Sequence, residues 1–163
     1  MNLQSMLKYN LGTADMVWKS YVSDLSDEDL MVRPVPGANH TKWQLGHLIA
    51  SEAVFNSLAS PSRAVALPSG FADRYSSKTA GSDDPADFDS KETLLALADE
   101  QRAVTLAVIE HLDEVPLDQP SPESMREYCP TVGDALVLIA GHWLMHAGQW
   151  AVTRRKLGRA PLF

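Results

Sequence analysis

The chain has 163 residues and a formal net charge of −7 at pH 7. This fits one domain and argues against a nucleic-acid partner, because proteins that bind the phosphate backbone are usually basic. Hydrophobic residues make up 45% and charged residues 21%, a globular balance that excludes wholesale disorder. The single cysteine, Cys129, excludes an internal disulfide and a multi-cysteine zinc site. No apolar run approaches the ~20 residues of a membrane span. The first residues lack a basic segment followed by an apolar one, so we expect a cytoplasmic protein without membrane contact.

Four stretches have the apolar spacing of amphipathic helices, and none has the alternation of a strand. In chain order they cover residues 2–24, 41–60, 90–112 and 131–157. Thr41-x-x-Gln44 fits a capping box at the start of the second helix, and Pro61 ends that helix. Thr131 fits the N-cap of the fourth helix, and Gly158 follows its end.

The helical spacing also predicts which side chains face the core. On the first helix these are Leu3, Leu7, Asn10, Ala14, Val17, Tyr21 and Leu25. On the last helix they are Leu138, Ile139, His142, Met145, His146, Gln149 and Val152.

Two connectors have a different composition from the helices. Residues 61–88 are rich in Ser, Ala, Gly, Pro and Asp, and residues 115–130 are rich in Pro. A loop as long as the first is uncommon unless it is a lid, a binding loop or disordered. We therefore predict an all-α four-helix bundle that occupies residues 1–163 as a single domain. The long connectors permit a crossover between helices.

Three of the five histidines fall on predicted core-facing positions. His142 and His146 are four residues apart, so both project from one side of a helix, and His47 lies on the core-facing side of the second helix. Imidazoles in an apolar interior need a partner, and a divalent metal would supply one. The alternative is a hydrogen-bonded core cluster without metal. Trp143 stands where the metalloprotease motif H-E-x-x-H has its catalytic Glu, which disfavours that class.

The remaining histidines and one carboxylate are expected to lie away from this cluster. His40 and His111 stand near helix ends, where we expect them to face solvent. Glu52 is five residues after His47, about 140° around the helix, so we do not expect it to bind the same metal.

Other polar and aromatic side chains are candidates for supporting the histidines. Asn10, Gln101 and Gln149 could orient an imidazole or lie at a wet edge of the core. Trp43 and Trp143 could form the wall of a substrate pocket or simply pack in the core.

Two segments of the chain resemble the DinB-like superfamily, which includes the YfiT-type metalloenzymes. They are WQLGHLIASE at residues 43–52 and GHWLMHAGQ at residues 141–149. The resemblance implies a four-helix bundle, often a homodimer, with a divalent metal on His47, His142 and His146. Zinc or nickel is the metal it implies first, followed by iron or manganese. Some relatives use the metal to activate a low-molecular-weight thiol. Others are sulfoxide synthases with a second domain, for which this chain has no room.

The leading functional hypothesis is a metal-dependent thiol S-transferase that acts on a small electrophilic substrate. Arg63, Arg74 and Lys78 in the first connector could bind the carboxylates of a thiol cosubstrate. A metal-dependent hydrolase that acts through metal-bound hydroxide is the second hypothesis. A non-catalytic metal-binding or stress-associated dimeric scaffold is the third.

Overall fold

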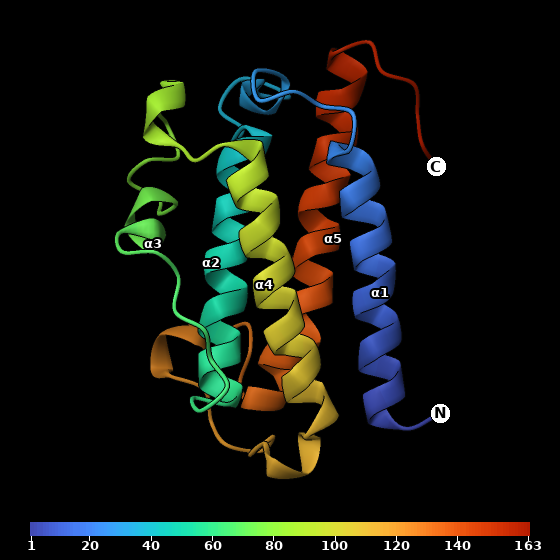
Figure 1. Ribbon diagram of the computed structural model, residues 1–163, viewed down its shortest axis with the longest axis vertical. Coiled ribbons are helices and arrows are strands. Elements are labelled where there is room, and N and C mark those ends of the chain that lie inside the picture. Colours follow the sequence, from blue (N-terminus) through green and yellow to red (C-terminus); the bar gives the residue numbers. More distant parts are fainter.

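The computed structural model describes residues 1–163, and it contains helices and no strands, as predicted. Four long helices form a bundle (Figure 1), and a short fifth helix lies beside it. The long helices are α1 (Leu3–Val22), α2 (Thr41–Ala59), α4 (Lys91–Glu110) and α5 (Val132–Lys156), and the short one is α3 (Phe71–Arg74). Short 3-10 turns occupy Asp29–Met31, Pro85–Asp87, Leu112–Glu114 and Glu123–Met125.

The connector between α2 and α4 makes the bundle a crossover structure. In Figure 1, α1 and α5 run upward while α2 and α4 run downward, so residues 60–90 must return along the length of the bundle. Each long helix packs against two others, with α1 against α5 and α4, and α2 against α4 and α5. This order brings α2 and α5, which carry the three candidate histidines, into direct contact.

The predicted helix starts are correct, but the cap of α2 differs from the expectation. His40, not Thr41, is the N-cap, and its Nδ1 accepts a hydrogen bond from the Trp43 backbone N–H at 3.0 Å. His40 is fully buried, so the expectation that it faces solvent was wrong. Gln44 does not close a capping box, because its amide donates instead to the Asn39 carbonyl at 2.7 Å. At α5 the predicted Thr131 cap is confirmed, with Asp134 completing a capping box.

The core-facing sides of α1 and α5 are rotated relative to the prediction. On α1 the buried residues are Leu7, Leu11, Ala14, Trp18 and Val22, whereas Leu3 and Asn10 are exposed. On α5 the core includes Ile139, Trp143, Ala147 and Trp150, while Met145, Gln149 and Val152 are exposed. The tryptophans explain the rotation, because each offers more apolar surface to bury than any other side chain on these helices.

The first connector is packed against the bundle rather than loose. Its aromatic side chains Phe71, Tyr75 and Phe88 are buried, and α3 contacts α2. Tyr75 lies directly on the backbone of α2 at Gly46, where an added Cβ would be only 2.2 Å from the Tyr75 ring. Glycine is therefore required at position 46 for the connector to approach this closely.

No helix combines the length and the apolar character that crossing a lipid bilayer requires.

Candidate metal centre

His47, His142 and His146 converge between α2 and α5. One nitrogen from each ring can be chosen so that all three lie within 4.8 Å of one another. The ring centroids are 5.1 Å apart for His47 and His142, 5.7 Å for His47 and His146, and 5.0 Å for His142 and His146. The i, i+4 spacing on α5 supplies two of the rings, and the packing of α2 against α5 supplies the third.

These imidazoles have the protonation state that a metal requires. Burial, with the neighbouring histidines as a smaller cause, lowers the pKa of His142 and of His146 to about 4. Burial also lowers the pKa of His47. All three rings are therefore neutral at pH 7 and can donate a lone pair to a cation. Two nitrogens bound to one tetrahedral zinc lie about 3.4 Å apart, so side-chain rotations that draw the rings closer would complete the site.

Gln44 determines which nitrogen of His146 is free. Its Oε1 accepts from the Trp150 indole N–H at 2.7 Å and lies 3.0 Å from His146 Nδ1, while its Nε2 donates to the Asn39 carbonyl. An indole only donates and a carbonyl only accepts, so the amide has a single orientation. His146 Nδ1 must then carry the proton, which leaves the Nε2 lone pair available for a metal.

Trp43 supports His47 from the other side of the cluster. The two rings are stacked, with centroids 5.0 Å apart and planes inclined by 6°. The Trp43 indole N–H donates to the Ser76 carbonyl and to Thr79 Oγ1, both at 3.2 Å. The first connector therefore orders one of the three candidate ligands through Trp43.

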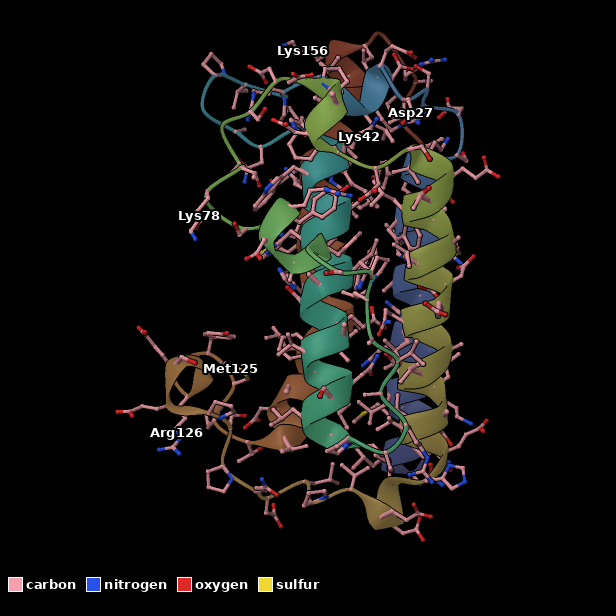
Figure 2. The ribbon with its side chains drawn as sticks, turned by 60° about the vertical axis from the view of Figure 1, so that its left-hand side comes forward. Asp27, Lys42, Lys78, Met125, Arg126 and Lys156 are labelled. Atoms are coloured by element: carbon pink, nitrogen blue, oxygen red, sulfur yellow. The ribbon has the colours of Figure 1, made fainter.

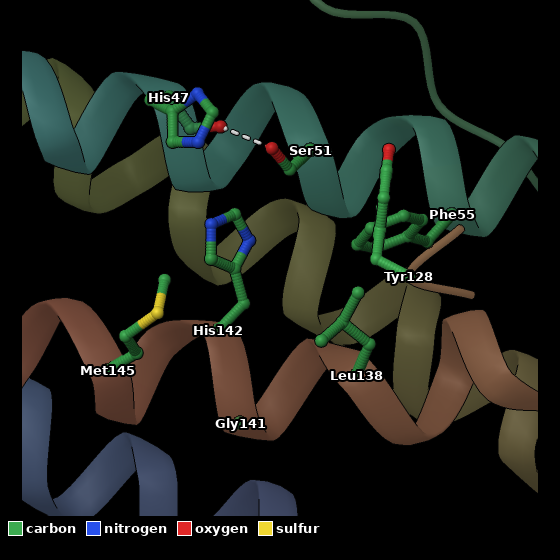
Figure 3. A pocket seen from close by; sticks show the side chains of 8 residues that line it. All are labelled: His47, Ser51, Phe55, Tyr128, Leu138, Gly141, His142 and Met145. Atoms are coloured by element: carbon green, nitrogen blue, oxygen red, sulfur yellow. Dashed lines mark hydrogen bonds between the residues drawn. The ribbon is translucent and has the colours of Figure 1, made fainter. Parts of the chain in front are cut away.

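A pocket of about 380 Å³ opens beside the cluster, and His47 and His142 form part of its wall. Figure 3 shows these two rings facing each other across it. The other lining residues are Ser51, Phe55, Tyr128, Leu138, Gly141 and Met145. Tyr128 comes from the second connector, so both connectors contribute to the site. This wall has few polar groups: two imidazoles and two hydroxyls, with no charged side chain.

Neither tryptophan proposed as a pocket wall lines this pocket. Trp43 packs against His47 as described, and Trp143 is buried in the core against Trp18, with ring centroids 4.6 Å apart. The Trp143 indole N–H donates to Glu52 Oε2 at 2.7 Å. The wall is formed instead by Phe55, Leu138 and Met145, because the rotation of α5 turns Trp143 inward.

The Glu52 carboxylate forms its hydrogen bonds with residues other than the three histidines. Its carboxylate accepts from Arg102 at 2.9 and 3.1 Å and from Thr105 Oγ1 at 2.6 Å, in addition to Trp143. These contacts join α2, α4 and α5 in the interior. The expectation that Glu52 does not belong to the ligand set agrees with this placement.

The three polar residues expected behind the ligands have different positions. Asn10 is exposed on α1 and hydrogen-bonds to none of the histidines. Gln101 is buried on α4, where it contacts Asn56 and the Val65 carbonyl rather than a histidine. Gln149 reaches the cluster through one intermediate, because its Oε1 accepts from Gln44 Nε2 at 3.0 Å.

The basic side chains of the first connector do not line the pocket. Arg63 pairs with Glu114 and Arg74 pairs with Asp89, at 2.7 and 2.6 Å. Figure 2 shows Lys78 pointing outward from the connector. Cys129 is buried, and burial raises the pKa of its thiol, which makes it a poor nucleophile.

Sequence reasoning missed Gln44 and Tyr128. Gln44 looked like a capping residue, and only its partners on α5, more than 100 positions away, show its role. Tyr128 stands in a connector with no periodicity, so no local pattern places it at the site.

A family model described as the DinB superfamily matches residues 11–150, a range that contains all three histidines. No curated protein and no solved structure gives a significant match to the chain.

Proposed function

Because the chain belongs to the DinB superfamily, we propose that His47, His142 and His146 hold a divalent cation and that this centre is catalytic. The observation that carries the proposal is the convergence of three neutral imidazoles beside a pocket. Imidazole ligands suit zinc and nickel, and also iron, so we propose zinc or nickel as the metal.

The three histidines are placed so that a reactant in the pocket could reach a metal bound to them. His146 is the most deeply placed of the three and is held by Gln44, whereas His47 and His142 line the pocket. A three-histidine set leaves coordination positions open, as catalytic zinc sites do. The open positions would then face the pocket. A cation held there lowers the pKa of a bound thiol or water and so supplies a nucleophile at neutral pH.

Transfer of a small thiol to an electrophile is our leading proposal for the reaction, with support from the family and from the open pocket. Hydrolysis of a small substrate is the second candidate. It is favoured by one observation: no basic side chain lines the pocket to bind the carboxylates of a thiol cosubstrate.

The first experiment measures the metal content of untagged protein by plasma mass spectrometry, beside the variants His142→Ala and His111→Ala. We expect near-stoichiometric zinc or nickel in the wild type and in His111→Ala, whose replaced side chain is exposed, and loss of metal in His142→Ala. Circular dichroism checks that both variants are folded.

Activity assays on the metal-loaded protein then separate the two reactions. Glutathione and 2-mercaptoethanol with 1-chloro-2,4-dinitrobenzene test thiol transfer, and 4-nitrophenyl acetate tests hydrolysis. A protein that neither contains nor takes up metal would refute both, and the histidines would then be a hydrogen-bonded cluster in a non-catalytic scaffold.

A further inference from the structure

The pocket beside the histidines has a wall chemistry that restricts what can bind there. Phe55, Leu138 and Met145 supply an apolar surface, and Gly141 adds no side chain. None of the eight lining residues carries a fixed charge. A charged group placed against this wall would lose part of its hydration without gaining an ion partner, which is costly.

The arginines of the two connectors have their partners outside the pocket. Arg63 and Arg74 are paired with carboxylates outside the pocket. Arg126 lies two residues from Tyr128, but its Nε donates to the Ser121 carbonyl at 2.7 Å, and Figure 2 shows its side chain pointing away from the helices. No cation is therefore aimed at an anionic ligand in the pocket.

The polar groups that remain suit a neutral ligand. Ser51 Oγ already donates to the His47 carbonyl at 2.8 Å, as Figure 3 shows. The Tyr128 hydroxyl has no partner within the protein, so it is free to hydrogen-bond to a bound molecule. The volume of about 380 Å³ lies near the lower end of the range for small-molecule sites.

We propose that the pocket selects an uncharged, largely apolar small molecule, of the size of a substituted benzene ring or a short alkyl chain, and presents it to the metal. This inference names the substrate class of the proposed metal centre and rests on that proposed function. The apolar part lies against Phe55, Leu138 and Met145, and the reacting group lies toward His47 and His142.

The test uses hydroxamates, which share one metal-binding group and differ in the attached tail. Protein labelled with ¹³C at the methionine methyl groups is loaded with zinc and titrated by NMR with acetohydroxamate, benzohydroxamate and 4-carboxybenzohydroxamate. The Met145 methyl reports on the pocket wall, and the resonance is assigned with Met145→Leu. Met16 is an internal control, because it is 56% exposed on α1, compared with 58% for Met145.

We expect benzohydroxamate to shift the Met145 methyl and to bind about tenfold more tightly than acetohydroxamate, because the ring buries apolar surface. The carboxylated compound should bind about tenfold more weakly than benzohydroxamate. Met145→Lys should remove or reverse that discrimination. Val137→Lys adds the same charge at a position that is 55% exposed and outside the pocket, so it should leave the discrimination unchanged.

Metal-free protein separates failure of this inference from failure of the metal proposal. If zinc does not bind, the hydroxamates lose their anchor, but benzyl alcohol should still shift the Met145 methyl more than benzoate does. Equal or tighter binding of the charged compounds, or equal shifts at Met16 and Met145, would overturn the inference whether or not zinc is bound.

Discussion

At the scale of single residues, Gln44 orients one of the candidate ligands without being a candidate ligand itself. It fixes the proton on His146 Nδ1 and ties that ring to Trp150 and to the chain before α2. Partners of this kind raise the basicity of a ligand and hold its orientation. A metal site can therefore be weakened by a change that removes none of its ligands.

Gln44→Ala is expected to weaken zinc binding by about 10- to 100-fold while the helical content is retained. Gln44→Glu keeps an acceptor for His146 and Trp150 and should recover most of the affinity. Gln149→Ala is the matched control, because Gln149 only accepts from Gln44. Competition with a chromophoric chelator measures all four proteins, and unchanged affinity in Gln44→Ala would show that the hydrogen bond does not act on the site.

Gly46 illustrates how one missing side chain permits a tertiary contact. Gly46→Ala would place a methyl group inside the Tyr75 ring, so we expect the free energy of unfolding to fall by about 1–3 kcal/mol. Gly148→Ala on α5 meets nothing within 4 Å and should be neutral or stabilising by up to about 1 kcal/mol. Urea denaturation compares the two. A destabilisation that persists when Tyr75→Ala is added would mean that the ring is not its cause.

At the scale of elements, a buried ion-paired carboxylate joins the helices of the bundle, in addition to apolar packing. Glu52 on α2 receives hydrogen bonds from Arg102 and Thr105 on α4 and from Trp143 on α5. Arg102 also pairs with Asp15 on α1 at 3.1 Å. All four long helices therefore contribute to one ion-paired cluster around Glu52. Glu52 directly follows Ser51, which lines the pocket.

Glu52→Ala should lower the free energy of unfolding by about 3–5 kcal/mol, because it leaves the Arg102 guanidinium buried without this partner. The exposed pair Lys19–Asp99 is the control, and Lys19→Ala should cost at most about 1 kcal/mol. Denaturant titrations of both variants give the comparison. Similar small losses in the two would show that the buried carboxylate is not needed for stability.

At the scale of the whole molecule, four histidines are held neutral in the folded chain. Burial lowers the pKa of His40 to about 4, as it does for His142 and His146, and the Arg33 charge adds to the effect at His40. His40 must remain neutral to cap α2, because its Nδ1 accepts a hydrogen bond there. Protonation would convert this acceptor into a donor.

The metal-free protein is therefore expected to lose stability as the pH falls from about 6.5 to about 4. Well above pH 6.5 these histidines are neutral in both states. Below pH 6.5 the histidines of the unfolded chain bind protons, whereas those of the folded chain do not. The free energy of unfolding therefore decreases. Each unit of pKa difference is worth about 1.4 kcal/mol. Asp24 and Asp27 have lowered pKa values, so their contributions are lost only at more acidic pH.

Denaturant titrations between pH 4 and 8 measure this dependence. His40→Asn retains a good capping residue but removes one titrating group, so its slope should be smaller than that of the wild type. His111→Asn, which makes the same substitution at an exposed position, is the matched control. A stability that is flat across this range would contradict the assignment of neutral buried histidines.

The helices and the histidine pair of α5 could be predicted from the sequence because both depend on short-range signals. Spacing of apolar residues, caps such as Thr131 and Asp134, and the i, i+4 pair on α5 all act within one or two turns. The acidic charge and the single cysteine likewise follow from composition alone. The family model over residues 11–150 confirms the resemblance carried by the two histidine segments.

Only the tertiary structure decided how each helix is rotated and which distant groups meet. Trp143 and Trp150 turn one side of α5 inward, which leaves Met145 to line the pocket and Gln149 exposed. Gln44 hydrogen-bonds to His146, and Tyr75 packs on Gly46. Both contacts depend on the course of loops that no local sequence pattern predicts. The physical reason is that the side chains buried on one helix depend on how much apolar surface the other three helices bury at the same time. A hydrogen bond between distant residues can form only once the helices are packed in that arrangement.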